Sequence, residues 1–277
     1  FDHRLTLARV LVTGGAGYVG ALAARALAAA GHEPVVFDNL VTGWREAVRW
    51  GPLVEGDLLD GQALDAAFAA HAPDAVMHFA ALSNVGISVR EPELYWRNNV
   101  AGSLALLEAM ARHRVPRIVF SSTAAVYGAP EAAASLTEND AEAPINAYGR
   151  SKLAVEHMLR DWAAAAGAGF VAFRYFNAAG AEPEHGIGEH HEPETHLIPL
   201  ALQAVAGKRE RLVLHGTDYD TPDGTCIRDY VHVADLADAH LRGLEHLLAN
   251  RESLVLNLGS GSGHSVRAVI EAAERVT

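Results

Sequence analysis

Three side chains in this sequence could move a proton at an alcohol. Tyr148 and Lys152 are four residues apart, so both side chains would lie on one face of a helix. A cation beside a phenol lowers the phenol's pKa, and such a phenol can take the proton of a sugar hydroxyl while hydride leaves to a cofactor. Thr123 could hydrogen-bond the same hydroxyl and orient it. Taken alone, the pair could equally belong to an exposed helix with an incidental tyrosine and lysine.

A glycine turn near the start of the chain predicts a dinucleotide site. Gly14, Gly17 and Gly20 have the spacing G-x-x-G-x-x-G, which would allow a tight turn, close approach of a pyrophosphate, and packing of a helix whose N-terminus faces the phosphates. Asp38 follows the next apolar run and could accept both ribose hydroxyls of an adenosine. A 2′-phosphate would meet this carboxylate, which favours NAD over NADP. Asp57 could accept from the adenine amino group or cap a turn.

The elements that would position these groups alternate along the chain, as apolar runs and alanine-rich periodic segments. The runs predict strands at Arg9–Thr13, Glu33–Asp38, Ala75–Phe79, Arg117–Ser121, Gly169–Arg174, near Leu212–Leu214 and at Val255–Asn257. The periodic segments predict helices at Tyr18–Ala30, Gly61–His71, Trp96–Arg112, Tyr148–Ala166 and His232–Leu248, and Ala132–Ala134 also favours helix. This alternation is typical of a doubly wound parallel sheet, an α/β Rossmann-like fold whose ligands bind at the carboxyl ends of the strands.

Composition excludes several classes of protein. The formal net charge is −12 with no basic run, so neither nucleic acid nor an anionic membrane is an expected partner. Cys226 is the single cysteine, which rules out an internal disulfide and fits a reducing cytoplasm. No apolar stretch approaches the ~20 residues that a bilayer-spanning helix needs. The first four residues precede the first strand without a methionine and are interpreted as a tag remnant.

A histidine-rich loop raises the question of a metal site. His185, His190, His191 and His196 lie among several glutamates. The helical spacing H-E-x-x-H is missing, and adjacent histidines on a loop are usually solvated. We therefore expect no metal. Cys226 lies beside Arg228 and could be reactive, although a buried structural thiol is the simpler interpretation.

These motifs, in this order, resemble the extended short-chain dehydrogenase/reductase superfamily over nearly the whole chain. The most specific part is the segment from Gly216 to Val233, followed by Asp235–His240, which is similar to the UDP-hexose 4-epimerases of that superfamily. The resemblance implies a tightly bound NAD, a UDP-hexose substrate, and interconversion of UDP-glucose and UDP-galactose by oxidation at C4, rotation of the 4-keto sugar and re-reduction. It also implies a homodimer that pairs the helices Trp96–Arg112 and Tyr148–Ala166, which otherwise only cover the sheet.

The same resemblance assigns roles to individual residues. The catalytic residues would be Thr123, Tyr148 and Lys152. The cofactor would be bound by Gly14, Gly17, Tyr18, Val19, Gly20, Asp38, Asn39, Leu40, Thr42, Gly43, Asp57, Leu58, Phe79, Ala80, Ala81, Ser83, Asn98, Ser121, Tyr148, Lys152 and Phe176. The nucleotide sugar would be bound by Thr123, Tyr148, Asn177, His196, Leu197, Val213, Leu214, His215 and Arg228.

The sequence departs from the family pattern at a few positions. Ser83 stands where some epimerases have a lysine near the cofactor, Ala81 where a glycine is common, and Thr123 where many have a serine. The family pattern continues past Thr277 with residues that line the nucleotide and the sugar. Those positions are absent from this sequence, so the choice between hexose, N-acetylhexosamine and pentose is not readable from it.

Periodicity weakens between Glu182 and Pro199, which predicts two parts. Residues 1–180 would form the NAD-binding domain and residues 181–277 a smaller nucleotide-sugar lobe, with segments at about 228–263 returning to the NAD domain. Regular structure should resume near Arg228–Asp235.

Related activities stay open. A 4,6-dehydratase needs an acid and a base carboxylate beside the catalytic hydroxyl, but Ala124 and Ala125 follow Thr123. A decarboxylase or epimerase acting on UDP-glucuronate needs a cation for the substrate carboxylate, which the sequence does not clearly mark. A non-catalytic NAD-binding protein would have no use for the intact set of Thr123, Tyr148 and Lys152.

Overall fold

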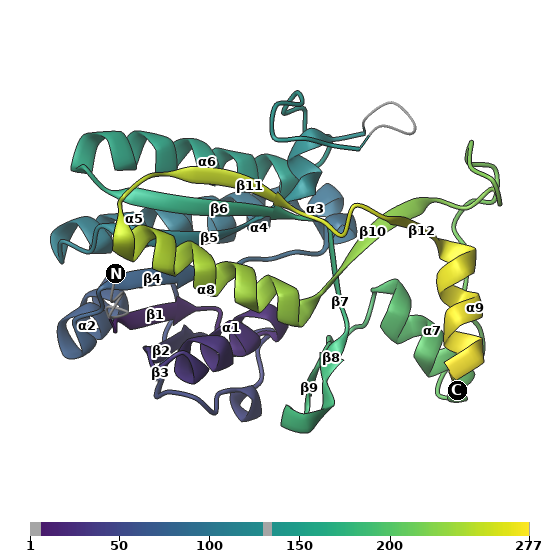
Figure 1. The fold of residues 1–277 in the computed structure, drawn as a ribbon, viewed down its shortest axis with the longest axis horizontal. Helices are drawn as coiled ribbons and strands as arrows, with labels where there is room; N and C mark the ends of the chain where they lie inside the picture. Colours follow the sequence, from purple (N-terminus) through teal and green to yellow (C-terminus); the bar gives the residue numbers. More distant parts are fainter. Residues whose placement is uncertain (1–6, 130–134, 277) are drawn as a thin grey trace, which may run out of the picture.

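Seven parallel strands form the central sheet of the computed structural model, which describes residues 7–129 and 135–276 (Figure 1). The strand order is β11-β6-β5-β4-β1-β2-β3. The strands are β1 (Arg9–Thr13), β2 (Glu33–Asp38), β3 (Leu53–Glu55), β4 (Ala75–His78), β5 (Arg117–Thr123), β6 (Gly169–Tyr175) and β11 (Leu254–Leu258). The sheet confirms the predicted doubly wound α/β fold. The tag remnant expected at residues 1–4 and the alanines at 132–134 lie outside the described residues.

Helices cover both faces of this sheet, as its apolar strands require. The helices against it are α1 (Tyr18–Ala29), α2 (Gly61–His71), α5 (Gly102–Arg112), α6 (Ala147–Ala166) and α8 (Val233–Ala249). On one face, α2, α5 and α6 pack in the cluster that holds Leu11 and Phe120. On the other, α1 and α8 pack in the cluster that holds Val10 and Val12. The side chains of neighbouring β1 residues thus point to opposite faces of the sheet, because successive side chains alternate along a strand.

The chain changes direction in the sheet at β1. From β1 the order runs through β2 to β3 on one side and through β4 to β5, β6 and β11 on the other. Ligands of open α/β sheets bind in the crevice at such a switch point, beyond the carboxyl ends of the strands. The chain leaves β1 at Gly14 and β4 at Phe79, so the glycine turn lies at this crevice.

The predicted helix Trp96–Arg112 has an irregular start. Residues Trp96–Ala101 form a π-helical turn, η2, which continues directly into α5. The short helices α3 (Val85–Arg90) and α4 (Pro92–Tyr95) precede it. Single-turn helices also occur at η1 (Arg45–Ala47), η3 (Ala124–Tyr127) and η4 (Pro183–His185).

A smaller lobe follows β6 (Figure 1). Its elements are β7 (Asn177–Ala179), β8 (Ala181–Glu182), β9 (Ile187–Gly188), α7 (Leu197–Val205), β10 (Ile227–His232), β12 (Gly263–Ser265) and α9 (Val266–Val276). Strand β10 pairs in parallel with β7 and antiparallel with β12, and α7 lies against α9. Strand β10 confirms the return to regular structure expected near Arg228. Among the described residues, no helix is both long and apolar enough to cross a bilayer.

One predicted strand is wrong. The run near Leu212–Leu214 forms no strand, and Val213 and Leu214 are 54% and 36% exposed. A short apolar run becomes a strand only where a neighbouring strand accepts its backbone hydrogen bonds. Within the described part of the chain, these residues have no such neighbour.

Candidate active site

The glycine turn is shaped by close backbone contacts. Gly14 has φ +74°, and a Cβ there would lie 2.5 Å from the Ala80 nitrogen, while a Cβ at Gly20 would lie 2.2 Å from the Gly14 carbonyl oxygen. A Cβ at Gly17 would meet only that same oxygen, at 3.3 Å. Gly17 is the N-cap of α1 and offers no side-chain cap, so the first amides of the helix face outward without a partner from a cap. Such a terminus suits the pyrophosphate of a dinucleotide.

Asp38 is held where its carboxylate can meet a ribose. Its Oδ2 accepts from the Ala16 amide at 3.0 Å and its Oδ1 from the Leu40 amide at 2.9 Å. A carboxylate has about four acceptor directions, so two remain for hydroxyl groups. A Cβ at Gly43 would lie 3.1 Å from Oδ1, which shows how closely the loop wraps around the carboxylate.

Asp57 caps a turn, which was the alternative to a contact with the adenine. Its Oδ1 accepts from the Leu59 amide and its Oδ2 from the Asn39 side chain, both at 2.8 Å. It thereby ties the end of β3 to the loop after Asp38. The structure places both predicted adenosine residues on adjacent loops, at the carboxyl ends of β2 and β3.

The predicted catalytic residues come together because α6 starts against the turn after β5. Asn146 caps α6, its side chain accepting from the Gly149 amide at 2.8 Å. A Cβ at Gly149 would lie 2.6 Å from the Ala125 carbonyl oxygen, so this glycine lets the helix approach the turn. Tyr148 in the first turn of α6 then hydrogen-bonds through its side chain with Thr123, the last residue of β5.

Lys152 lies one turn further along α6 and is only 3% exposed. Its Nζ donates to the Ser121 carbonyl oxygen at 2.7 Å and lies 4.9 Å from the centre of the Phe120 ring. Burial lowers the pKa of Lys152 to about 7. The ammonium therefore loses much of its preference for the charged form at neutral pH.

The phenol of Tyr148 has a pKa raised by burial, and the hydrogen bond with Thr123 opposes that shift. The lowering expected from the lysine cation is thus not achieved by the residues of the chain alone. Thr123 is the side chain that acts to lower the phenol's pKa. An edge contact with the Tyr95 ring, at 6.4 Å between centroids, fixes the other side of the phenol.

Sequence reasoning missed Asn99, a buried amide beneath the site. Its Nδ2 donates to Ser151 Oγ and to the Leu82 carbonyl oxygen, both at 3.0 Å, and its Oδ1 accepts from the Leu82 amide at 2.8 Å. Asn98, which was predicted at the cofactor, donates to the same Oδ1 at 2.9 Å. Asn99 thus joins the loop after β4 to α6. The sequence signal for this residue was the pair Asn98 and Asn99 inside a segment predicted to be helical. A buried amide needs hydrogen-bond partners, so such a pair indicates a structural polar contact.

A second buried chain of polar groups links β1 and β4 to α5. His78 Nδ1 lies 2.7 Å from Thr13 Oγ1, and His78 Nε2 lies 2.8 Å from Ser103 Oγ. Burial, with a smaller contribution from the Lys152 charge, lowers the pKa of His78 to about 3. The imidazole is therefore neutral and holds the carboxyl ends of both strands in place beside the crevice.

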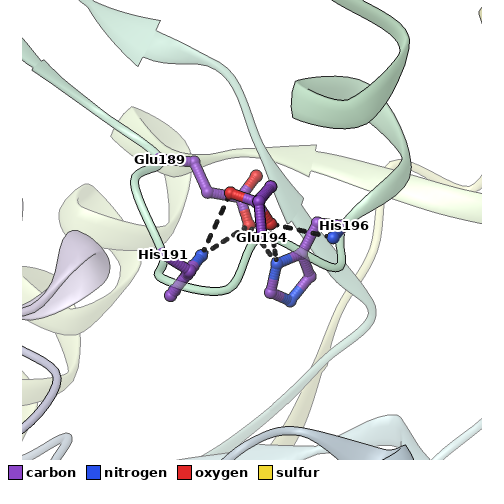
Figure 2. A group of neighbouring side chains, drawn as sticks. All are labelled: Glu189, His191, Glu194 and His196. Atoms are coloured by element: carbon purple, nitrogen blue, oxygen red, sulfur yellow. Dashed lines mark hydrogen bonds and ion pairs between the residues drawn. The ribbon is translucent and has the colours of Figure 1, made fainter. Parts of the chain in front are cut away.

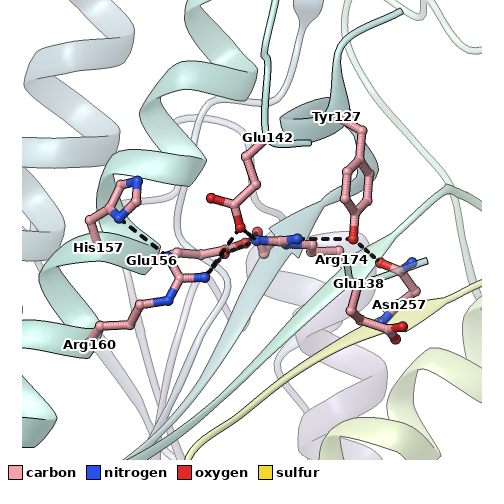
Figure 3. A network of polar contacts seen from close by, with 9 residues as sticks. Tyr127, Glu138, Glu142, Glu156, His157, Arg160, Arg174 and Asn257 are labelled. Carbon is pink, nitrogen blue, oxygen red and sulfur yellow. Dashed lines mark hydrogen bonds and ion pairs between the residues drawn. The ribbon is translucent and has the colours of Figure 1, made fainter. Parts of the chain in front are cut away.

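A buried ion pair anchors α6 to β6 of the sheet (Figure 3). Arg174 of β6 and Glu156 of α6 are both fully buried, and their two hydrogen bonds measure 2.9 and 2.6 Å. Arg174 also donates to the Tyr127 hydroxyl at 2.9 Å and pairs with Glu142. Glu156 is one turn beyond Lys152, so the pair holds this part of α6 against β6.

The predicted nucleotide-sugar residues are only partly brought together. Asn177 starts β7, lies opposite Tyr230 of β10, and donates to the Asp229 carbonyl oxygen at 3.2 Å. Arg228 is two residues from Tyr230 on the same strand and is exposed. These two predicted residues are therefore neighbours.

The remaining predicted substrate residues lie elsewhere in the lobe. His196 occupies the N-cap position of α7 without a side-chain capping hydrogen bond, and Leu197 begins the helix. Val213, Leu214 and His215 lie on a segment without regular structure. Among the described residues, no hydrogen bond joins either group to Asn177 or Arg228.

Two of the loop histidines contact the segment that follows Asp38. The Trp44 ring stacks on His190 with centroids 4.5 Å apart, and its Nε1 donates to the His190 carbonyl oxygen at 3.2 Å. Arg49 Nη1 donates to the His185 carbonyl oxygen at 2.5 Å. These contacts join the adenosine side of the crevice to the smaller lobe.

Comparison with known proteins agrees with this geometry. The model of the NAD dependent epimerase/dehydratase family matches residues 10–259. A UDP-glucose 4-epimerase of Rhizobium meliloti (strain 1021) is 51% identical over 267 residues, 96% of this chain and 81% of the relative.

Solved structures are similar over the same extent. UDP-glucose 4-epimerase from Brucella ovis in complex with NAD has a TM-score of 0.93 and 51% identity, covering 96% of this chain and 82% of that one. The enzyme from Stenotrophomonas maltophila, with bound NAD and formylated UDP-arabinopyranose, has a TM-score of 0.93 and 41% identity, covering 98% and 83%. These similarities confirm the resemblance drawn from the sequence motifs.

Proposed function

The chain belongs to the NAD dependent epimerase/dehydratase family, and we propose that it interconverts UDP-glucose and UDP-galactose by transient oxidation at C4. One observation carries the proposal: Thr123, Tyr148 and Lys152 assemble at the carboxyl end of β5, beside a glycine turn suited to a dinucleotide. About half of the sequence is identical to UDP-glucose 4-epimerases across nearly the whole chain.

NAD is the cofactor, and when bound it accepts a hydride from C4 of the sugar and returns it. The outward amides at the start of α1 would hold the pyrophosphate, and the free acceptor directions of Asp38 would take the ribose hydroxyls. Ser83 offers a hydroxyl where some relatives place a lysine. Phe79 and Phe176 supply apolar surface along the crevice.

Tyr148 acts as the proton acceptor for the 4-hydroxyl. Its phenol already hydrogen-bonds with Thr123, so a sugar hydroxyl that enters this pair meets both an acceptor and an orienting hydroxyl. The proton stays at the phenol while the sugar carries a 4-keto group, and it returns to the oxygen on re-reduction. Proton transfer by a positioned side chain of this kind contributes about 10²–10⁴ in rate.

Lys152 is expected to assist proton transfer to Tyr148. Its Nζ is held by the Ser121 carbonyl oxygen and the Phe120 ring, which keeps a cation on the same helical face as the phenol. A cation there favours phenolate. Because burial has brought the pKa of Lys152 to about 7, any additional negative charge at the site restores the ammonium.

The smaller lobe anchors the UDP group while the sugar turns. Arg228 is exposed at the start of β10, and a guanidinium forms paired hydrogen bonds with diphosphate oxygens. We expect Asn177, on the neighbouring strand β7, to contact the sugar nucleotide. In this division residues 1–180 bind NAD and residues 181–277 bind the nucleotide sugar, with α8 and β11 returning to the large sheet.

We propose a homodimer built on the helices Trp96–Arg112 and Tyr148–Ala166, since Trp96 and Leu104 expose apolar side chains there. The single cysteine favours the cytoplasm, and the acidic net charge argues against a nucleic-acid partner. The proposed substrates place the enzyme in galactose metabolism. Sedimentation of the purified chain would reveal the dimer as twice the mass of 29.4 kDa.

The decisive test is a turnover assay with UDP-galactose and no added NAD. The proposal predicts formation of UDP-glucose, lost in Tyr148→Phe. If neither the purified chain nor the chain with added NAD converts UDP-galactose, the substrate assignment is wrong. Conversion of UDP-N-acetylgalactosamine or a UDP-pentose instead would move the assignment to that nucleotide sugar.

A further inference from the structure

Four side chains gather in the loop between β9 and α7 (Figure 2). Glu189, His191, Glu194 and His196 each offer a ligand atom, and these atoms all lie within 4.8 Å of one another. The sequence argued against a metal because helical H-E-x-x-H spacing is missing. A folded loop does not need that spacing, and here the pattern E-x-H-x-x-E-x-H brings the four groups together.

The separations between these atoms match a small coordination sphere. His196 Nδ1 lies 2.9 Å from an oxygen of Glu189 and from an oxygen of Glu194. His191 Nδ1 lies 3.6 Å from an oxygen of each of the same two carboxylates. Neighbouring ligands of a tetrahedral zinc ion, with bonds of about 2.0–2.1 Å, are about 3.3–3.4 Å apart. The observed separations lie on both sides of this value.

The two carboxylates lack a fixed cation. The side chains of Glu189 and Glu194 are only 9% and 7% exposed, and two buried like charges at one place are costly unless paired. In the described part of the chain, neither carboxylate forms an ion pair with a lysine or an arginine. The available partners are the two imidazoles, of which His196 already hydrogen-bonds through Nδ1 to Glu194 Oε1 at 2.9 Å. A dication would balance both carboxylates at once.

A buried ring nitrogen gives an independent indication. His191 Nδ1 is buried and has no hydrogen-bond partner, although it faces both carboxylates. Buried polar atoms without partners are rare in native proteins. A metal ion among the four groups would satisfy this nitrogen through its lone pair.

We propose that Glu189, His191, Glu194 and His196 form a binding site for one divalent transition-metal ion of the zinc type. Two imidazoles and two carboxylates are a donor set that zinc accepts in tetrahedral sites, whereas calcium and magnesium prefer oxygen ligands throughout. The ion cross-links the two ends of the loop and ties it to the first residue before α7. The site does not depend on the reaction proposed above.

The test measures metal directly, on the whole chain with its NAD. The protein is treated with EDTA, desalted, titrated with zinc chloride by calorimetry, and assayed for zinc after gel filtration. One zinc per chain is expected. His191→Ala and Glu189→Gln should each weaken zinc binding at least tenfold, while the adjacent His190→Ala should keep full stoichiometry. Cobalt chloride should give the strong visible absorption of a tetrahedral site, lost in His191→Ala.

The proposal is overturned if the parent chain, after titration with zinc chloride and gel filtration, retains no zinc. It is also overturned if His191→Ala binds zinc as tightly as the parent, or if His190→Ala does not bind it. In the first case the cluster is held by protonated histidines alone. Far-UV circular dichroism shows whether each variant is folded. If Glu189→Gln does not fold, the partly exposed His191 decides the question. None of these readouts uses turnover, so failure here leaves the epimerase proposal untouched.

Discussion

The two sides of the active site are built in different ways. On the sheet side, Thr123 and Lys152 are buried and held by strand register, a helix cap and backbone hydrogen bonds. On the lobe side, Arg228 and His215 are exposed, and the residues expected to bind UDP come from separate segments. The groups expected to move the proton are thus held by contacts of the chain itself, whereas among the described residues no hydrogen bond joins the separate segments expected to hold UDP.

This difference separates chemistry from anchoring. Changes on the sheet side should alter turnover or stability, and changes on the lobe side should alter substrate affinity. A sheet-side substitution that changes only affinity, or a lobe-side substitution that changes only turnover, would contradict this division.

The largest effect is expected at Tyr148. Tyr148→Phe removes the proton acceptor and should lower kcat by about 10²–10⁴ with little change in KM, because the ring and its packing are kept. Steady-state kinetics with UDP-galactose measure both constants. Tyr219→Phe, at an exposed tyrosine of the lobe, is the matched control and should leave kcat unchanged. A kcat for Tyr148→Phe within tenfold of the parent would assign proton transfer to another group.

The buried ion pair should give the largest effect on stability. Arg174→Met leaves the buried Glu156 with only Arg160, at 3.3 Å, and the Ser122 hydroxyl as partners among the described residues, and breaking a buried pair in this way costs about 3–5 kcal/mol. The free energy of unfolding in urea should fall by that amount. Arg160→Met, which removes a half-exposed pair with the same glutamate, should cost less than about 1 kcal/mol. Equal losses in the two variants would contradict the role given to burial.

On the lobe side, Arg228→Met should act on affinity. Loss of charged hydrogen bonds to the diphosphate is worth about 1.5–3 kcal/mol, so KM should rise about 10- to 100-fold, with kcat nearly unchanged. The free energy of unfolding should not change, because the side chain is exposed. Arg209→Met is the control. A fall in kcat without a rise in KM would place Arg228 with the chemistry instead.

A pH-dependent effect on stability is expected from Lys152. Its pKa is lowered in the folded chain to about 7, so between pH 7 and the unfolded value near 10.5 the unfolded chain holds a proton that the folded chain does not. Stability of the NAD-free chain should therefore rise with pH in this window, by up to about 1.4 kcal/mol per pH unit from this residue. Lys152→Met should remove that contribution. Parallel pH profiles for parent and variant from pH 7 to 9.5 would contradict it.

The sequence predicted the features that depend on local patterns and missed those that depend on distant contacts. Strands β1 and β2 and helix α2 were placed at their bounds, because continuous apolar runs and alanine periodicity act locally. The proximity of Tyr148 and Lys152 could be predicted for the same reason, since both residues lie on one helix. Leu212–Leu214 failed because strand formation depends on a partner elsewhere in the chain.

Residues whose role arises only from tertiary contact were missed. Asn99 becomes important through Leu82 and Ser151, and Arg174 through Glu156, a residue 18 positions away. The loop cluster of Glu189 and His196 likewise exists only once the loop is folded. Spacing rules for helices carry no information about such a loop.

The proposed reaction requires that a single site oxidise C4 of the sugar and then reduce the same carbon. The most direct measurement uses UDP-galactose labelled with deuterium at C4, incubated with the chain and excess unlabelled NAD. We predict that the UDP-glucose formed keeps the deuterium at C4, because the hydride never leaves the site. Loss of the label to water, or to the added NAD, would contradict the claim.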